Sequence, residues 1–247
     1  MATRKVLVIG ESCLDVFTYC EASRLAPDLP VPVLEKVASI ETPGMAHNVY
    51  NNLLALGIEA EMLTNQDWRD HRKERLVHKK TNHTFLRLDS RHQVVNDFKH
   101  PDYSQFGVVI ISDYDKGYLS EETISEICSK HPMVLLDTKK QIGKYAQECF
   151  LIKINLDEAA RSESTLGDFD ENLIVTLGPA GAKYRGAIYE QKEVVDVFDT
   201  SGAGDSFIAS LASSLVLGLS VTEAIIQANI DAASVVRKKG VSLIERA

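Results

Sequence analysis

Late in the sequence, a glycine-rich stretch ends on a carboxylate and leads directly into an apolar segment. The stretch covers residues 199–205 and has the sequence DTSGAGD. Gly202 and Gly204 allow a tight turn that exposes backbone N–H groups, and a following helix adds partial positive charge at its N-terminus. These features predict an anion site for a transferring phosphoryl group, with Asp205 placed to accept a proton from an attacking hydroxyl. An ordinary turn, with Asp205 as a helix cap, is the alternative for the glycine pattern alone.

The segments around this stretch alternate between short buried strands and helices. Apolar runs predict strands at residues 5–9, 61–64, 107–111, 133–136, 150–154 and 173–177. Helices are predicted at 46–56, from 120 onward, at 155–161, at about 203–217, and from 220 to a stop signal at 237–240. This alternation favours a parallel sheet with helices on both faces.

Two regions do not follow the alternation. Residues near 15–40 and 70–98 are rich in strand-forming patterns, and residues 31–40 predict an edge strand because prolines are tolerated there. These regions predict a small second sheet that lies over the main domain.

Composition narrows the function classes. The 247 residues suit one α/β domain, and the formal net charge of -8 argues against a nucleic-acid-binding surface. No apolar run reaches the roughly 18 residues needed to span a membrane, and the N-terminal apolar run is too short for a signal peptide. Cys13, Cys20, Cys128 and Cys149 form no C-x-x-C pair, so we predict free thiols and a cytoplasmic enzyme.

The string DTSGAGDSF resembles the C-terminal signature of the ribokinase-like sugar kinases, also called the phosphofructokinase-B family. The resemblance covers nearly the whole chain and implies a single kinase domain over residues 1–247. The implied fold class is α/β, a ribokinase-like three-layer sandwich with a mostly parallel central sheet plus a small β lid from about 15–40 and 70–98. By the same resemblance, Asp205 is the base of an ATP-dependent kinase. The implied anion hole is formed by Gly202, Ala203 and Gly204.

Further segments resemble the same family and imply a metal site and a nucleotide site. Asn155 and Glu158 match its N-x-x-E motif, which organises Mg²⁺ and phosphate, and oxygen ligands suit that ion. A helix start rich in polar residues is the alternative for this tetrapeptide. The nucleotide-side residues implied by the resemblance are Thr176, Gly178, Gly181, Asn229 and Ala232.

The N-terminal half most resembles the kinases that phosphorylate D-glycero-D-manno-heptose 7-phosphate at O1. The matching segments are SRLAPDLPVPV at 23–33, TPGMAHNVYNN at 42–52, KER at 73–75, LRLD at 86–89 and SDYDKG at 112–117. Guanidinium groups in these segments suit the geometry of a phosphate. The substrate-binding residues implied by the resemblance are Asp15, Gly44, Asn48, Arg75, Arg87, Asp113 and Lys116.

Departures from the family pattern bear on the site. Met45 replaces a glycine and His47 replaces a small residue, both beside Asn48. Their bulk would reshape the sugar pocket, although His47 could equally be a packed structural histidine. Lys153 and Ile154 stand where relatives have Thr-Pro.

The chain is also short for this family. It lacks the turn and helix that relatives carry after Thr64, and this gap is expected to expose apolar surface unless an oligomer or residues 66–80 cover it. A lid sheet needs its edges covered. We therefore predict a homodimer through the lid, with neither nucleic acid nor membrane as a partner.

Three functions stay open at this point. The first is heptose 7-phosphate 1-kinase activity, and the second is a kinase for another sugar or sugar phosphate. The third is a non-catalytic homologue that binds nucleotide or sugar; the missing segment favours it, and the intact Asp205 motif argues against it. A dinucleotide-binding oxidoreductase is disfavoured, because only Gly10-Glu11-Ser12 follows the first strand, with no G-x-G-x-x-G.

Overall fold

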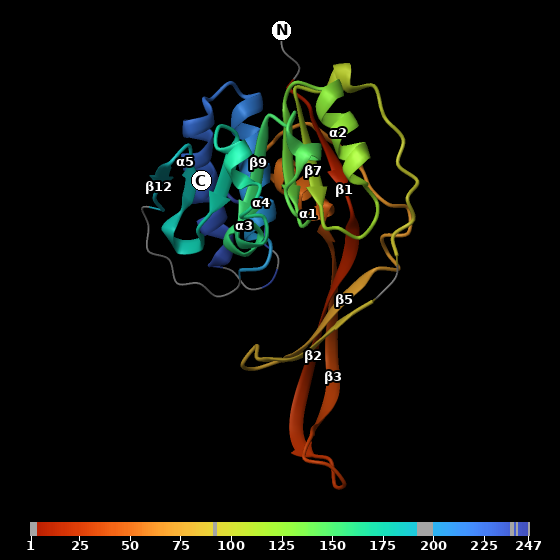
Figure 1. The fold of residues 1–247 in the computed structure, drawn as a ribbon. Helices are drawn as coiled ribbons and strands as arrows, with labels where there is room; N and C mark the ends of the chain where they lie inside the picture. The colour runs from red at the N-terminus through yellow and green to blue at the C-terminus, as the bar shows by residue number, and fades with distance from the viewer. Residues whose placement is uncertain (1–3, 91–92, 192–199, 238–239, 241, 247) are drawn as a thin grey trace.

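A computed structural model describes residues 4–90, 93–191, 200–237, 240 and 242–246, and it shows a body built on one large sheet (Figure 1). The strands lie in the order β12-β11-β10-β9-β8-β7-β1-β4. Neighbours from β4 to β10 run parallel, and β11 and β12 pair antiparallel at one edge. The bounds are β1 (Val6–Gly10), β4 (Ala60–Leu63), β7 (Val108–Asp113), β8 (Val134–Thr138), β9 (Leu151–Asn155), β10 (Leu173–Thr176), β11 (Ala182–Tyr184) and β12 (Ala187–Tyr189).

Helices cover both faces of this sheet, which explains why its central strands are apolar on both sides. Val6 and Val8 of β1 face one cluster, and Leu7 and Ile9 face the other. The first face carries α1 (Ala46–Ala55), α4 (Ala203–Val216) and α5 (Val221–Val236). The other face carries α2 (Glu121–Lys130), with irregular segments beside it, and the short α3 (Leu156–Arg161) follows β9.

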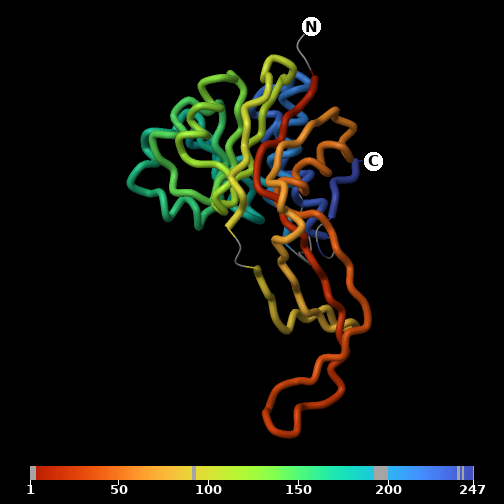
Figure 2. Tube along the Cα trace, turned by 90° about the vertical axis from the view of Figure 1, so that its right-hand side faces the viewer, coloured from red at the N-terminus to blue at the C-terminus, as the bar shows by residue number. Residues whose placement is uncertain are grey.

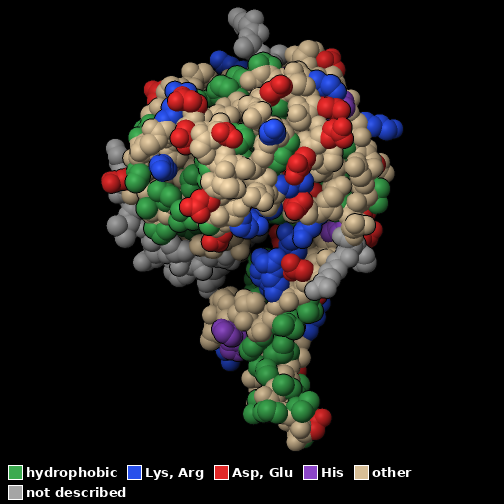
Figure 3. Space-filling view, viewed as in Figure 1, with side chains coloured by type: hydrophobic (Ala, Val, Ile, Leu, Met, Phe, Trp, Pro, Cys, Tyr) green, Lys and Arg blue, Asp and Glu red, His purple; other side chains and the backbone are tan. Residues whose placement is uncertain are grey.

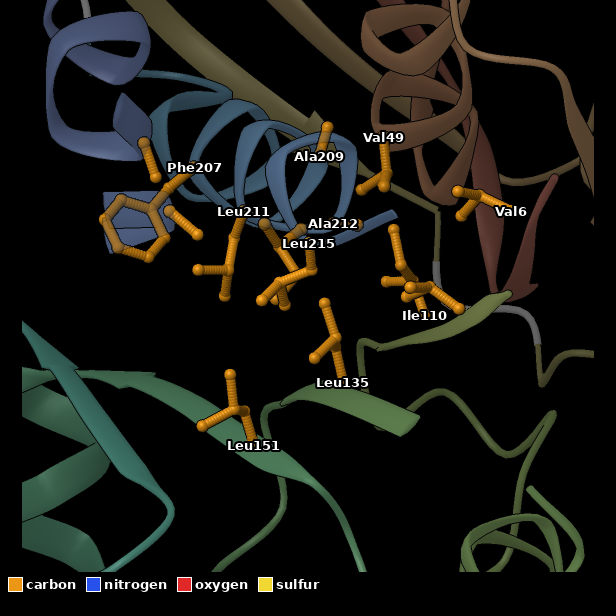
Figure 4. Close-up of a cluster of buried hydrophobic side chains, with 14 of the residues drawn as sticks. Val6, Val49, Ile110, Leu135, Leu151, Phe207, Ala209, Leu211, Ala212 and Leu215 are labelled. Carbon is orange, nitrogen blue, oxygen red and sulfur yellow. The ribbon is translucent and has the colours of Figure 1, made fainter. Parts of the chain in front are cut away.

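The core between α4 and the sheet fixes where the glycine-rich turn lies. Leu211 and Leu215 of α4 point toward Leu135 and Leu151 on the strands (Figure 4). Burial of such side chains contributes about 1.5–3 kcal/mol each. The first turn of α4 is thereby held above the carboxyl ends of the strands.

A second sheet projects from the body as a lid, in the strand order β3-β2-β5-β6. Its strands are β2 (Ser12–Leu25), β3 (Pro32–Met45), β5 (Arg72–His78) and β6 (Thr84–Asp89). The hairpin of β2 and β3 extends well beyond the body in both views (Figures 1 and 2). β3 is an edge strand, as predicted from its prolines. The predicted fold class is therefore confirmed, lid included.

The short connection after Thr64 leads directly from the body to the lid. Residues 66–70 form a turn, and β5 begins at Arg72. β4 is the edge strand of the large sheet, and Met62 and Leu63 on it are only partly buried. The residues between β4 and β5 therefore form a turn, and none of them forms a helix over this edge.

The prediction of four free thiols was wrong for one pair. Cys128 near the end of α2 and Cys149 just before β9 form a disulfide, with their Cα atoms 5.1 Å apart. Sequence spacing did not show this pairing, because the fold brings the two positions together from separate elements. Cys13 and Cys20 are free and buried. Across the described residues, no helix combines the length and apolarity that a membrane crossing requires.

Candidate active site

The candidate site lies where the parallel strands end, which is where ligands bind in open α/β sheets. A polar cavity of about 490 Å³ opens there, beside the start of α4. Gly202 precedes the helix with a φ of 83°, a conformation that suits glycine. Asp205 stands in the first turn of α4 and lines the cavity. Asp137, Lys139, Lys153, Asn155 and Thr176 contribute from the strand ends and the loops after them.

Asp205 is held by two hydrogen bonds from distant parts of the chain. The Asn48 side-chain amide donates to it at 2.9 Å, and the Tyr114 hydroxyl donates to it at 2.6 Å. Burial raises the pKa of Asp205 above its ordinary value, although both hydrogen bonds oppose that rise. Burial and the neighbouring Asp205 charge raise the pKa of Tyr114 well above its usual range, so Tyr114 is a neutral donor. The result is an oriented carboxylate that can accept a proton.

Two lysines bring positive charge into the same cavity. The Lys153 ammonium donates to Asp137 at 2.9 Å, and Lys139 forms an ion pair with Glu158. Burial lowers the pKa of Lys139, but the charges of Asp137 and Glu158 outweigh that effect and leave it raised. The cavity therefore offers cations for an anionic ligand.

The residues with a predicted Mg²⁺ role are engaged within the protein. Asn155 caps α3, and its side chain accepts from the Glu158 backbone N–H at 2.9 Å. The Glu158 side chain accepts in return from the Asn155 backbone and from Lys139. Within the described part of the chain, no group of three or more His, Cys, Asp or Glu side chains could hold a metal ion. These residues do not fit a direct metal cage, and the helix-start alternative describes their geometry.

The predicted nucleotide residues gather around a second cavity of about 370 Å³. This cavity is bounded by the 178–181 turn and the last helix, and apolar residues such as Pro179, Phe207 and Val236 contribute to its wall. It shares Thr176 and the start of α4 with the polar cavity. An apolar pocket that continues into a polar one suits a flat ring attached to phosphates. The residues predicted to bind nucleotide that line it are Thr176, Gly178, Gly181, Asn229 and Ala232.

Figure 3 shows Lys and Arg side chains gathered around a hollow where the lid meets the body. Arg75 lies directly opposite Arg87 on the neighbouring strand of the lid. Like charges placed opposite each other are unfavourable unless they are compensated. Arg75 approaches Asp15 at 3.4 Å, and Arg87 forms two hydrogen bonds to Asp89 at 2.7 and 2.9 Å.

The other predicted sugar-side residues lie in different environments. A Cβ on Gly44 would meet the Asp15 carboxylate at 2.0 Å, so these two residues pack tightly together. Lys116 is exposed and lines a small pocket that also contains Met45. The Asp113 carboxylate accepts hydrogen bonds from Lys140 and Thr138. Its substrate role stays a prediction, and its visible contacts are with neighbouring segments of the chain.

Met45 and His47, the two bulky residues that depart from the family pattern, have different surroundings. Met45 precedes α1 with a φ of 61°, a strained conformation for a residue that is not glycine, and it lines the small pocket near the lid. The His47 ring packs against the Trp68 ring, with centroids 4.3 Å apart and planes tilted by 42°. Burial lowers the pKa of His47 to about 4, so it is neutral at physiological pH. The packing of His47 agrees with the structural alternative.

Sequence reasoning did not assign site roles to Tyr114, Asp137, Lys139 or Lys153. Tyr114 belongs to the matched segment 112–117, but its contact with Asp205 reaches across the fold. Lys153 had a local signal, since it is a lysine inside an otherwise apolar strand, LIKIN. Such a residue needs a partner or a ligand.

The chain is similar to known proteins in both sequence and fold. The model of the pfkB family carbohydrate kinases matches residues 69–246. The bifunctional protein HldE of Methylococcus capsulatus is 32% identical, over 97% of this chain and 62% of its own length. The HldE of Helicobacter pylori strain G27 is 30% identical, over 97% of this chain and 64% of its own. A ribokinase from Thermotoga maritima matches the fold with a TM-score of 0.72 at 18% identity, covering 96% of this chain and 94% of the ribokinase.

This chain is shorter than the HldE proteins to which it aligns. The chain spans less than two thirds of each HldE protein. The alignment with the Methylococcus protein extends over 293 residues, more than the 247 of this chain. The relative therefore has aligned segments without a counterpart here, in agreement with the shortness predicted from the sequence.

Proposed function

The chain belongs to the pfkB family of carbohydrate kinases, and on this premise we propose that it phosphorylates O1 of D-glycero-D-manno-heptose 7-phosphate. A carbohydrate kinase of this family is an ATP-dependent phosphotransferase with an alcohol group as acceptor. The observation that carries the proposal is the buried Asp205, oriented by Asn48 and Tyr114 at the start of α4. It lies beside the polar cavity that joins the apolar one, and the lid cations lie on the sugar side.

The proposed reaction uses this chain's residues as follows. Asp205 takes the proton from the anomeric hydroxyl as that oxygen attacks the γ-phosphorus of ATP. The backbone N–H groups from Gly202 to Gly204 stabilise the developing charge, aided by the positive end of α4. Tyr114 and Asn48 keep the carboxylate oriented. Mg²⁺ would arrive with the ATP phosphates and water, because Asn155 and Glu158 are committed to each other and to Lys139.

The substrate assignment rests on the lid and on the resemblance of the N-terminal half. Arg75 and Arg87 would receive the 7-phosphate as guanidinium donors, in place of part of their present pairing with Asp15 and Asp89. Likeness to the HldE proteins supports the same substrate. The test is ADP release with Mg-ATP and a panel of free and phosphorylated sugars. Turnover on heptose 7-phosphate supports the proposal. Turnover only on another sugar would contradict this substrate and would indicate that the pocket lined by Met45 selects a different sugar.

Arg87→Gln is expected to raise the KM for heptose 7-phosphate by roughly 10–100-fold and to leave the KM for ATP nearly unchanged. The reason is that a hydrogen bond to a charged group contributes about 1.5–3 kcal/mol, and only the sugar phosphate would use this one. Steady-state kinetics with both substrates measure the effect. The matched control is Arg185→Gln, an exposed arginine paired with Glu171 away from the lid. An equal rise for both substrates would remove Arg87 from the phosphate site.

We further propose that two copies associate through the lid. Its exposed apolar side chains include Ile40, Leu86 and Leu88, and its edges are open to pairing. Light scattering at micromolar concentration should give twice the 27.3 kDa chain mass, and the double variant L86E/L88E should shift it toward one chain. A monomer from the unaltered protein would contradict this proposal.

A non-catalytic role is the remaining alternative. It is favoured by the short connection after Thr64, where the described residues 66–70 form a turn instead of a helix. Binding of ATP by folded protein that turns over no sugar on the panel would decide for it. A cytoplasmic setting stays a prediction.

A further inference from the structure

Lys153 is a buried cation at a position where packing of the fold does not require a charged side chain. It lies in β9 between apolar neighbours, and its side chain is only 3% exposed. Burying an ammonium requires removing it from water, and a buried ion pair seldom stabilises a fold more than apolar residues of the same size. Its partner Asp137 lies at 2.9 Å and is itself nearly buried. Packing therefore does not account for a lysine at this position.

The ammonium also lies directly against the start of α4. A Cβ on Gly204 would be 2.8 Å from the Lys153 Nζ atom. The N-terminus of a helix carries partial positive charge, so a second positive group beside it is unfavourable unless an anion joins them. Lys153 and Asp205 line the same cavity. An anion bound by the amides of the 202–204 turn would be next to this ammonium.

The neighbouring groups explain how the cation is kept in place. Asp137 holds the Lys153 ammonium, while Lys139 is paired with Glu158. The carboxylates of Asp137 and Glu158 are already paired with lysines, so their oxygens do not form a direct metal site among the described residues. Lys139 and Lys153 therefore supply side-chain positive charge at this edge of the sheet, in addition to any Mg²⁺ that would arrive with ATP.

We propose that Lys153 binds the transferring phosphoryl group of ATP and is a catalytic residue of this chain, an assignment that rests on the proposed kinase function. Its ammonium donates to oxygens of the γ-phosphoryl group, while the amides of the 202–204 turn hold the others. The bond from the sugar oxygen to phosphorus forms, and the bond from phosphorus to the departing ADP oxygen breaks. The hydroxyl proton goes to Asp205, and Lys153 keeps its own protons throughout. Its positive charge would stabilise the negative charge that is spread over the three equatorial oxygens.

The direct test compares two nucleotides that differ by one phosphoryl group. Calorimetric titration of Lys153→Gln, which keeps a donor toward Asp137 but removes the charge, is measured with AMP-PNP and with ADP at one Mg²⁺ concentration. We expect affinity for AMP-PNP to fall about tenfold or more and affinity for ADP to change less than twofold. In turnover, kcat should fall by about 100-fold with the sugar KM unchanged. The matched control is Lys183→Gln, an exposed lysine on β11, which should change none of these values.

A second variant covers the event that Lys153→Gln does not fold. K153M/D137N removes both charges of the buried pair, so no unpaired carboxylate remains, and it is compared with D137N alone. The same selective loss of AMP-PNP affinity is expected. Equal losses for both nucleotides, or no loss, would overturn the role of Lys153 and leave the kinase assignment standing. Failure of the unaltered protein to bind AMP-PNP would overturn the kinase assignment itself.

Discussion

Asp205→Asn is expected to lower kcat by about 10³-fold while the protein stays folded. General-base catalysis contributes about 10²–10⁴-fold, and an amide cannot take the proton of the attacking hydroxyl. The change is nearly isosteric, and the amide oxygen can still accept from Tyr114 or Asn48, so orientation at the site is retained. Steady-state ADP release measures the effect, and circular dichroism checks the fold. Asp168→Asn, at an exposed carboxylate, is the control. Activity within tenfold of the unaltered enzyme would exclude Asp205 as the base.

The raised pKa of Asp205 fixes the sign of its pH effects. Because the folded pKa lies above the unfolded value of 3.8, folding favours the protonated form. The stability that Asp205 contributes is fully present below pH 3.8, and it is lost as the pH rises through the pKa of Asp205 in the folded protein. Asp205→Asn should therefore be at least as stable as the unaltered protein at neutral pH. Turnover needs the carboxylate, so kcat of the unaltered enzyme should fall as pH drops toward this raised pKa.

Gly10→Ala is expected to destabilise the protein by about 3 kcal/mol and to lower the melting temperature by roughly 10 °C. Gly10 pairs with Ser112 at the end of β1, and an added Cβ would lie 2.0 Å from the Ser112 carbonyl oxygen. That atom belongs to the backbone of a buried strand and cannot rotate away, so β1 and β7 must separate. Differential scanning calorimetry measures the change.

The same substitution should also damage the site. The next residue, Glu11, accepts hydrogen bonds from the backbone N–H groups of Tyr114 and Lys116, and this loop carries the Tyr114 hydroxyl to Asp205. Separation of β1 from β7 would shift that contact. The control is Gly167→Ala, because a Cβ there meets no atom within 4 Å. A melting temperature for Gly10→Ala within about 2 °C of the unaltered protein would contradict the close approach of the two strands.

The elements that are defined by local pattern were predictable from the sequence. Strands such as β1 and β7 are short apolar runs that end at a glycine or a carboxylate, and the capping pattern of Ser220 and Glu223 marked the start of α5. The glycine-rich turn before α4 could be recognised from its own residues, and an anion site there stays a prediction. The position of Asp205 in the first turn of α4 follows from that turn alone.

What depends on contacts between distant residues could not be predicted. The hydrogen bond from Tyr114 to Asp205 joins positions 91 residues apart, and the disulfide of Cys128 joins positions 21 apart. Neither spacing carries a local signal. Lys153 could be recognised as a charged residue among apolar neighbours in a strand. Its contact with Asp137 depends on the sheet register, and its position against Gly204 depends on the packing of α4. The 199–205 motif was only partly testable, since Asp199 lies outside the described residues.

The central claim is tested most directly by following the product with phosphorus NMR. Protein, Mg-ATP and heptose 7-phosphate are incubated, and the spectrum is recorded as ADP accumulates. The account predicts one new sugar phosphate signal coupled to the anomeric proton, which grows in step with ADP. ADP accumulation without a new sugar signal, or a phosphate coupled to a proton at another carbon, would contradict phosphorylation at O1.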